Sequence, residues 1–323
     1  MQRSYYDGWR TIINWSQDPG TPAVMAFTTI DATGQYTSMA IGTDNFPVIS
    51  YWDNTHFSLR VAHCNNAECS GTTDLTTVDA TGFTGMYPSI TIGTDHFPVI
   101  SYYDAANGDL RVAHCDNAAC TTSTKTTVDA TGNTGWYTSV AIGTDNFPVI
   151  SYYDGSNGDL RVAHCDNAAC TTSTKTTVDA TGNTGDHPSI AIGTDGFPVI
   201  SYKDQTNSDL RVAHCINVTC SGATNLTTVD ATGTTGLDGS ITIGSDHFPV
   251  ISYMNNTNGD LRVAHCDNTA CTSSTNAAVD TTGVTGQYTS VALGADHLPV
   301  ISYHDATNSR LRVVHCINVT CTP

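Results

Sequence analysis

The chain has 323 residues and a formal net charge of −18, since 30 aspartates and glutamates outnumber 12 lysines and arginines. Proteins bind nucleic acid and anionic membranes largely through lysine and arginine, so this composition argues against both as partners. Strong helix formers are scarce, while threonine, valine, isoleucine, tyrosine, glycine, asparagine and aspartate abound, which predicts strands and turns and no membrane-spanning helix.

The first 31 residues precede a set of repeats and divide into two parts. Residues 1–22 form an N-terminal extension rich in large apolar side chains, including Tyr5, Trp9 and Trp15. The opening Met1-Gln2-Arg3 does not begin the apolar core of a signal peptide, so a secreted form would have lost its leader. The segment "AVMAFTTID" (23–31) has the pattern of one strand and matches the last strand of the repeat that follows.

From residue 35 onward the chain repeats itself, with first cysteines at intervals of 51, 50, 50, 51 and 50 residues. One unit (137–185) contains four strand-like runs separated by turn residues. They are "SVAIG" (139–143), "FPVISYYD" (147–154), "LRVAHC" (160–165) and "KTTVD" (175–179). The dipeptide Asn157-Gly158 between the second and third runs is typical of a tight hairpin.

Four short strands in about 50 residues predict one blade of a β-propeller. The first three runs occur six times, and the last copy ends at Pro323 before any fourth run. Residues 23–31 supply the missing strand, so we expect an all-β propeller over 23–323 with six four-stranded blades closed by an N-terminal strand. Seven blades are the alternative, because "SYYDGWRTIINW" (4–15) resembles the second and third runs.

The cysteines fall into pairs with the spacing C-x4-C, and none is left over. An even, periodic set of this kind predicts one disulfide within each repeat and an oxidising, extracellular location. A histidine precedes each pair, which keeps metal binding open as an alternative, although structural zinc usually has C-x2-C spacing. The predicted pairs are Cys64–Cys69, Cys115–Cys120, Cys165–Cys170, Cys215–Cys220, Cys266–Cys271 and Cys316–Cys321.

Units of the type "SYYD…NGDL…VD…G…S" resemble those of secreted, mostly bacterial β-propeller repeat proteins. The resemblance covers residues 35–323 and implies architecture and an extracellular or cell-surface location. It implies no particular activity, because propellers host lectins, glycosidases, lyases and scaffolds.

The six copies share a framework but differ at two positions, just before the first strand and just after the "SY" of the second. In a propeller both positions lie on the face that commonly binds ligands, so we expect a candidate binding rim there, with drift at exposed loops as the alternative. Aromatic faces suit sugar stacking or a protein contact. The candidate residues are Trp52, Tyr87, Tyr103, Trp136, Tyr137, Tyr153, Asp186, His187, Lys203, Asp238 and His304.

Other polar patterns have structural explanations. The turn residues Asp104, Asn107 and Asp109 suggest Ca²⁺, but a hairpin turn favours the same residue types, so no cofactor is expected. The arginine of each third run, such as Arg111 or Arg161, is expected to pair with the aspartate of a fourth run, such as Asp79 or Asp129.

Three functions follow from these patterns. The first is a secreted, non-enzymatic propeller of lectin or adhesin type that binds a glycan or cell-surface ligand through one face. The second is a structural subunit that self-associates into an extracellular filament when residues 1–22 complete a neighbour's blade. The third is a polysaccharide hydrolase or lyase, for which only Asp186 and Asp238 are candidates, and no catalytic motif is recognisable.

Overall fold

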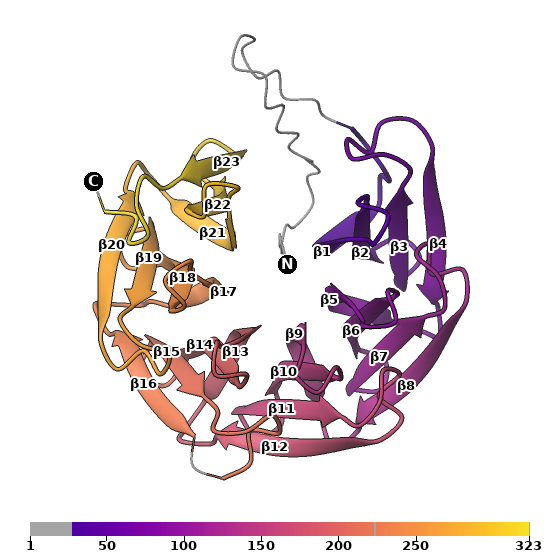
Figure 1. The fold of residues 1–323 in the computed structure, drawn as a ribbon, viewed down its shortest axis with the longest axis horizontal. Coiled ribbons are helices and arrows are strands. Elements are labelled where there is room, and N and C mark those ends of the chain that lie inside the picture. Colours follow the sequence, from indigo (N-terminus) through magenta and orange to yellow (C-terminus); the bar gives the residue numbers. More distant parts are fainter. Residues whose placement is uncertain (1–27, 223, 323) are drawn as a thin grey trace.

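The computed structural model describes residues 28–222 and 224–322. This part of the chain is all β, with 23 strands in six antiparallel sheets arranged around a central axis (Figure 1). No helix in it could cross a membrane. The predicted six-bladed propeller is confirmed.

Each sheet is one blade, and its strands follow chain order. Blade 1 contains β1 (Gly34–Ile41), β2 (Pro47–Asp53), β3 (Ser58–Cys64) and β4 (Thr73–Asp79). Blade 2 contains β5 (Thr84–Ile92), β6 (Pro98–Asp104), β7 (Asp109–Cys115) and β8 (Ser123–Asp129). Blade 3 contains β9 (Thr134–Ile142), β10 (Pro148–Asp154), β11 (Asp159–Cys165) and β12 (Ser173–Asp179). Blade 4 contains β13 (Thr184–Ile192), β14 (Pro198–Asp204), β15 (Asp209–His214) and β16 (Asn225–Asp230). Blade 5 contains β17 (Leu237–Ile243), β18 (Pro249–Asn255), β19 (Asp260–Cys266) and β20 (Ser274–Asp280). Blade 6 contains β21 (Thr285–Leu293), β22 (Pro299–Asp305) and β23 (Arg310–His315).

The first strand of each blade lies innermost and the fourth outermost (Figure 1). The second strand begins at a proline, such as Pro148, where the missing N–H disturbs the ladder least. That strand is buried along most of its length, because neighbouring blades cover both of its faces. The apolar clusters accordingly join adjacent blades: Leu110 and Val112 of blade 2 pack with Ile150 and Ala163 of blade 3.

Blade 6 has three strands within the described residues, and the predicted closing strand (23–31) lies mostly outside them, as does the partial seventh blade proposed for 4–15. The described end of that segment is informative. Asp31 accepts hydrogen bonds from Tyr51 and Arg60 at 2.7 and 2.5 Å. These are the contacts that the last residue of a fourth strand makes with the next blade, so Asp31 occupies the position of a fourth-strand aspartate relative to blade 1.

The arginine–aspartate pairing is confirmed, and it links neighbouring blades. Asp129, which ends β8 in blade 2, lies 2.7 Å from the Arg161 guanidinium of blade 3 and accepts a 2.7 Å hydrogen bond from the Tyr152 hydroxyl. Tyr152 is fully buried, and Arg161 lies over its ring. The same trio recurs at every boundary between consecutive blades.

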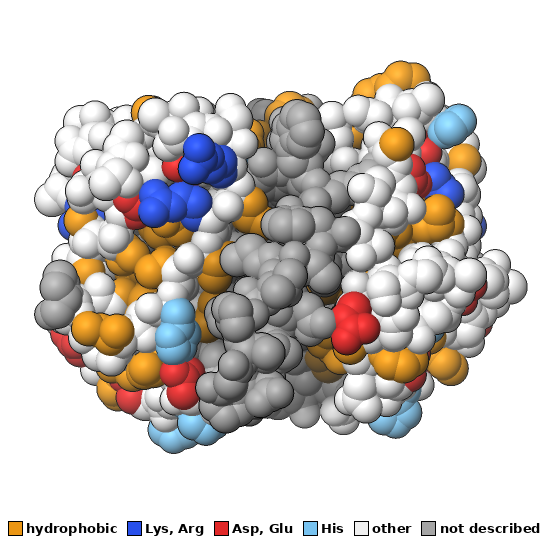
Figure 2. Space-filling view, turned by 90° about the horizontal axis from the view of Figure 1, so that it is seen from above, with side chains coloured by type: hydrophobic (Ala, Val, Ile, Leu, Met, Phe, Trp, Pro, Cys, Tyr) orange, Lys and Arg blue, Asp and Glu red, His pale blue; other side chains and the backbone are white. Residues whose placement is uncertain are grey.

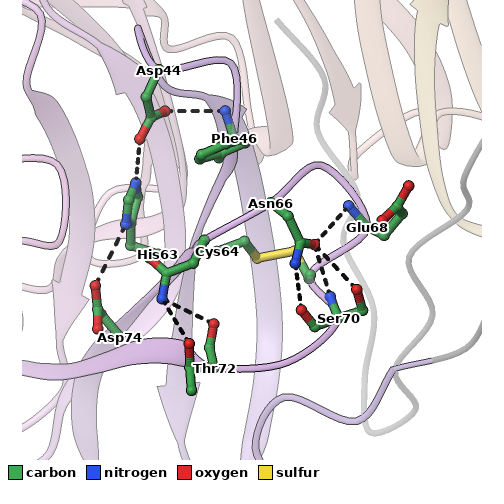
Figure 3. Close-up of a disulfide and its surroundings, with 11 residues drawn as sticks. Asp44, Phe46, His63, Cys64, Asn66, Glu68, Ser70, Thr72 and Asp74 are labelled. Carbon is green, nitrogen blue, oxygen red and sulfur yellow. Dashed lines mark hydrogen bonds and ion pairs between the residues drawn. A yellow bond between two sulfur atoms is a disulfide. The ribbon is translucent and has the colours of Figure 1, made fainter.

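All six predicted disulfides are present, and the described residues contain no free cysteine. The cysteines therefore cannot serve as thiolate ligands for a metal. The preceding histidine has another role: His63 Nε2 lies 2.7 Å from Asp44 Oδ2 in the turn between the first two strands (Figure 3). Every blade has this pair, which the sequence analysis did not anticipate.

The turn between the second and third strands is held by its own side chains. The Asp104 carboxylate accepts hydrogen bonds from the backbone N–H of Ala106 and Asn107, and from the Asn107 amide at 2.9 Å. These bonds account for the residue types that suggested calcium. Among the described residues, no group of three or more histidine, cysteine, aspartate or glutamate side chains is arranged to hold a metal ion.

Candidate functional site

One residue from each blade lies at the mouth of the central channel, at the same place in every innermost strand. In each blade the pairing with the second strand shifts register here, so that one extra residue is accommodated as a β-bulge. The extra residue has φ between 49° and 53° in all six blades, a left-handed conformation that costs a non-glycine residue about 1–2 kcal/mol. We call these residues the channel ring: Tyr36, Tyr87, Tyr137, His187, Asp238 and Tyr288.

The side chains of the channel ring contact one another in blade order. Ring centroids lie 4.6 Å apart for Tyr36 and Tyr87, and 4.4 Å apart for Tyr87 and Tyr137. His187 stacks on Tyr137 at 3.9 Å, and its Nε2 lies 3.3 Å from Asp238 Oδ1. Asp238 Oδ2 in turn accepts a hydrogen bond from the backbone N–H of Tyr288 at 3.1 Å. The contacts are therefore continuous from Tyr36 in blade 1 to Tyr288 in blade 6, with aromatic residues in blades 1–3 and charged groups in blades 4 and 5.

A pocket partly open to solvent, with a cavity volume of about 40 Å³, lies at the channel ring. Its walls are the six ring residues together with Pro188 and Gly239, the residues that follow His187 and Asp238 in the chain. Aromatic carbons dominate these walls, and polar groups are concentrated at blades 4 and 5. An apolar pocket with a few convergent polar groups is the usual form of a small-ligand site.

The residue just before each ring position and the variable residue of the second strand are direct cross-strand partners. The two variable positions that the sequence singled out thus form a single site in each blade. The pairs are Gln35–Trp52, Met86–Tyr103, Trp136–Tyr153, Asp186–Lys203, Leu237–Met254 and Gln287–His304.

The aromatic half of the site is tied together by asparagines of the connecting loops. Asn133 Oδ1 accepts hydrogen bonds from Tyr103 of blade 2 at 2.6 Å and from Trp136 of blade 3 at 2.9 Å. The Trp136 ring also stacks near Tyr87, at 6.2 Å between centroids. Tyr153 donates in the same way to Asn183, at 2.8 Å. Trp52, in blade 1, lies in a cluster with Phe57 and Phe83. The Phe57 and Phe83 rings stack with their centroids 4.6 Å apart.

The charged half is a network of four groups on blades 4 and 5. His187 Nδ1 lies 3.1 Å from Asp186 Oδ1, so the imidazole stands between the carboxylates of Asp186 and Asp238. Burial alone would lower the pKa of His187, but the two carboxylates raise it above its usual value. Burial would raise the pKa of Asp186, yet His187, Gln205 and Lys203 hold it below the usual range. Burial lowers the pKa of Lys203, and the two aspartates only partly offset this effect.

The predicted site residues differ in accessibility. Tyr87, Tyr137, His187 and Asp238 line the pocket, whereas Trp52, Tyr103, Asp186 and Lys203 are at most 7% exposed and support the walls from behind. Tyr153 and His304 lie at the rim, and the His304 imidazole contacts Gln287 Oε1 at 2.9 Å. The predicted site residues do not include Tyr36, Tyr288, Pro188 and Gly239, although the repeat pattern places each of them at or next to a ring position.

No family model matches the sequence, and no curated protein is detectably related to it. The fold resembles solved propellers. A putative 6-phosphogluconolactonase from Bacteroides fragilis aligns with a TM-score of 0.58 at 11% identity, over 97% of this chain and 92% of that one. An α-L-arabinanase from Penicillium chrysogenum, in complex with arabinobiose, aligns with a TM-score of 0.56 at 11% identity, over 88% and 92% of the two chains. The dihydro-heme d1 dehydrogenase NirN aligns with a TM-score of 0.52 at 12% identity, and the alignment covers 88% of this chain and 58% of that one. At such identities these likenesses establish the fold alone.

Proposed function

We propose that this protein is a secreted, non-enzymatic β-propeller that binds carbohydrate in the pocket at the channel ring. The observation that carries the proposal is the asymmetry of the ring. The six blades have similar sequences, yet the equivalent bulge residue is tyrosine in four blades, histidine in one and aspartate in one. These positions are buried or half-buried, so drift at exposed loops does not account for their differences.

The chemistry of the pocket suits a saccharide. Tyrosine rings offer flat apolar faces against which the C–H groups of a sugar pack, and their hydroxyls offer hydrogen bonds. His187 and Asp238 add polar groups on the opposite side of the mouth, where sugar hydroxyls would be oriented. The arabinanase with a similar fold was solved with a disaccharide bound. The six local disulfides support an oxidising, extracellular location.

Binding is favoured over hydrolysis by the state of the two carboxylates. A glycosidase needs one carboxyl group with a raised pKa as general acid and a second carboxylate beside the same bond. The pKa of Asp186 is lowered, and both carboxylates lie within 3.3 Å of the same imidazole. Asp186 is therefore not poised to donate a proton to a leaving group.

An oligosaccharide array that includes arabinobiose, followed by calorimetry with the strongest ligand, tests this proposal. Tyr137→Ala removes a ring that contacts both Tyr87 and His187, and we expect it to weaken binding at least tenfold. Ile216→Ala is the matched control, because Ile216 is 46% exposed in the turn between the third and fourth strands, on the opposite face. An array without any binding, or a Tyr137→Ala variant with unchanged affinity, would overturn the proposal. Release of reducing sugar from a bound oligosaccharide would favour the hydrolase instead.

A structural subunit is a second candidate, favoured by the edge of blade 6. Burial along β23 is incomplete, whereas the third strands of the other blades are largely buried. A strand from a neighbouring molecule, in place of residues 23–31 of the same chain, would complete this edge by addition to the sheet. Deletion of residues 1–22 and inspection by electron microscopy test this: polymers that disappear on deletion would support assembly, and monomers before and after deletion would exclude it.

A further inference from the structure

The residue that follows each channel-ring position links neighbouring blades where it is threonine. Thr138 Oγ1 in blade 3 donates to the Tyr87 carbonyl of blade 2 at 3.0 Å and accepts from Ser101 Oγ at 2.8 Å. In blade 6, Thr289 Oγ1 makes the equivalent contacts with the Asp238 carbonyl at 3.1 Å and with Ser252 Oγ at 2.7 Å. The threonine hydroxyl of one blade thus joins two groups of the preceding blade, a buried serine and the carbonyl of the channel-ring residue.

Blades 2, 4 and 5 lack this hydroxyl, because Pro88, Pro188 and Gly239 occupy the position. In the first case the matching serine, Ser50, donates instead to the Ser38 carbonyl at 3.4 Å. The serines that would pair with Pro188 and Gly239 are Ser151 and Ser201. Both serine side chains are fully buried, and neither hydroxyl has a hydrogen-bond partner within the described residues. Buried hydroxyls are nearly always paired, so two unpaired ones at adjacent blades require an explanation.

Steric conflict does not explain the glycine in blade 5. A Cβ at Gly239 would lie no closer than 3.7 Å to any non-neighbouring atom, and Ser201 Oγ would be 4.0 Å away. The backbone of Gly239 is also outside the left-handed region that favours glycine. A Cβ therefore has room at this position, yet the chain has glycine here, in the wall of the pocket.

We propose that Gly239 and Ser201 form the floor of the binding pocket, and that a ligand hydroxyl takes the place of the threonine hydroxyl in blade 5. The inference rests on the carbohydrate-binding function proposed above. By equivalence with Thr138, this hydroxyl accepts from Ser201 Oγ and donates to the backbone carbonyl of His187. The ligand is accordingly a saccharide that projects one free hydroxyl between blades 4 and 5, beside Asp238, while its ring lies against the tyrosines.

Gly239→Thr tests the inference because it supplies the hydroxyl from the chain itself. We expect the variant to bind the array-selected saccharide at least tenfold more weakly while its urea unfolding midpoint rises. Gly239→Ala is the control for lost backbone freedom: it should raise the midpoint less than Gly239→Thr and weaken binding less. Thr289→Gly, the reverse change in blade 6, should lower the midpoint.

The serine is tested separately against a matched serine. Ser201→Ala removes an unpaired hydroxyl, so we expect weaker saccharide binding with no loss of stability. Ser101→Ala removes the paired hydroxyl of blade 2 and should lower the unfolding midpoint.

The outcomes separate this inference from the function on which it rests. A wild-type protein that binds no saccharide overturns both. If the wild-type protein binds saccharide and the Gly239→Thr variant binds it equally well, only the inference about the pocket floor is overturned. A Gly239→Thr variant that is less stable than wild type also overturns it, because the threonine would then not reproduce the contacts of Thr138.

Discussion

At the scale of single residues, the aspartate at the end of each fourth strand makes several contacts at once. Asp129 accepts hydrogen bonds from the Thr131 hydroxyl at 2.6 Å and the Tyr152 hydroxyl at 2.7 Å, and pairs with Arg161. Its side chain is fully buried, so these bonds replace those that water makes with the unfolded chain. Removing the charge leaves a buried guanidinium without its closest counter-ion.

Asp129→Asn should therefore lower the free energy of unfolding by about 1.5–3 kcal/mol, the range for hydrogen bonds to a charged group. The measurement is urea unfolding followed by tyrosine and tryptophan fluorescence. Asp166→Asn, at an exposed turn position of blade 3, is the control and should change stability by less than about 0.5 kcal/mol. Equal effects of the two substitutions would show that the trio does not hold the blades together.

The same aspartates determine how stability depends on acid. Although burial acts to raise their pKa values, hydrogen bonds from threonine and tyrosine and the charge of arginine lower the pKa of Asp79, Asp129, Asp179 and Asp280. A lowered native pKa means that the folded protein holds these carboxylates ionised more strongly than the unfolded chain does. This contribution is complete above the unfolded pKa of about 4 and is lost as the pH falls through the lowered native values.

We therefore expect these groups to change the urea midpoint by no more than a few tenths molar between pH 5 and 6. Below about pH 4 the midpoint should fall steeply. Asp129→Asn should show a shallower fall, because one of the linked protonation steps is gone. A midpoint that stays constant down to pH 3 would contradict the assignment.

At the scale of the strand, β17 contains two glycine positions with different requirements. Gly236, immediately before the strand, has φ of +81°, and a Cβ there would lie 2.9 Å from the Leu210 Cα. Gly239, three residues further, has neither restriction. The first glycine is required by the close approach of neighbouring blades, whereas the second borders the pocket.

Gly236→Ala should destabilise the protein by about 1–3 kcal/mol, since it combines left-handed strain with a backbone clash. Gly239→Ala should be neutral or stabilising by up to about 1 kcal/mol, because it only restricts the unfolded chain. Thermal unfolding of both variants provides the comparison. A reversed order of stability would contradict the structural distinction between the two sites.

At the scale of the whole molecule, the junction between blades 6 and 1 differs from the others. The second strand of blade 6 is buried only at alternate residues, and Arg312 is 41% exposed where its equivalents in blades 2–4 are 15%. Hydrophobic side chains of this region reach the surface on the left of Figure 2, where blade 6 lies in Figure 1. Asp31 makes fourth-strand contacts with blade 1, although residues 28–31 are not themselves part of a strand. That residues 23–31 form the missing strand of blade 6 therefore stays a prediction.

Removal of residues 1–31 should therefore lower the unfolding midpoint and expose backbone amides of β21–β23 to hydrogen exchange before those of blades 3 and 4. Removal of residues 1–22 alone should leave both properties close to wild type if six blades close the ring. If the shorter deletion is as harmful as the longer one, residues 4–15 contribute a partial seventh blade. Mass spectrometry after deuterium labelling resolves the strands needed for this comparison.

The fold was largely predictable from the sequence because a blade is a local structure. The Asn157-Gly158 dipeptide, the run lengths and the C-x4-C spacing each involve residues close in the chain. The hairpin and the disulfides were confirmed, although the hairpin connection has four residues, 155–158, because Asp154 pairs with Asp159. The site was predictable only in part. The variable repeat positions include Tyr87, Tyr137, His187 and Asp238, which line the pocket. The repeat pattern does not show that Lys203 is buried behind Asp186, or that Trp52 packs beside Tyr36 without lining the pocket.

What the sequence alone determined is the repeating unit: its four strands, its disulfide, and the positions that vary between copies. Only the tertiary structure decided what those positions do. Residues about 50 apart, such as Tyr87 and Tyr137, become neighbours because successive blades converge on one axis, and the same convergence places Ser201 of one blade against Gly239 of the next. Local pattern fixes a blade, since its contacts lie within one unit, whereas the pocket depends on contacts between units.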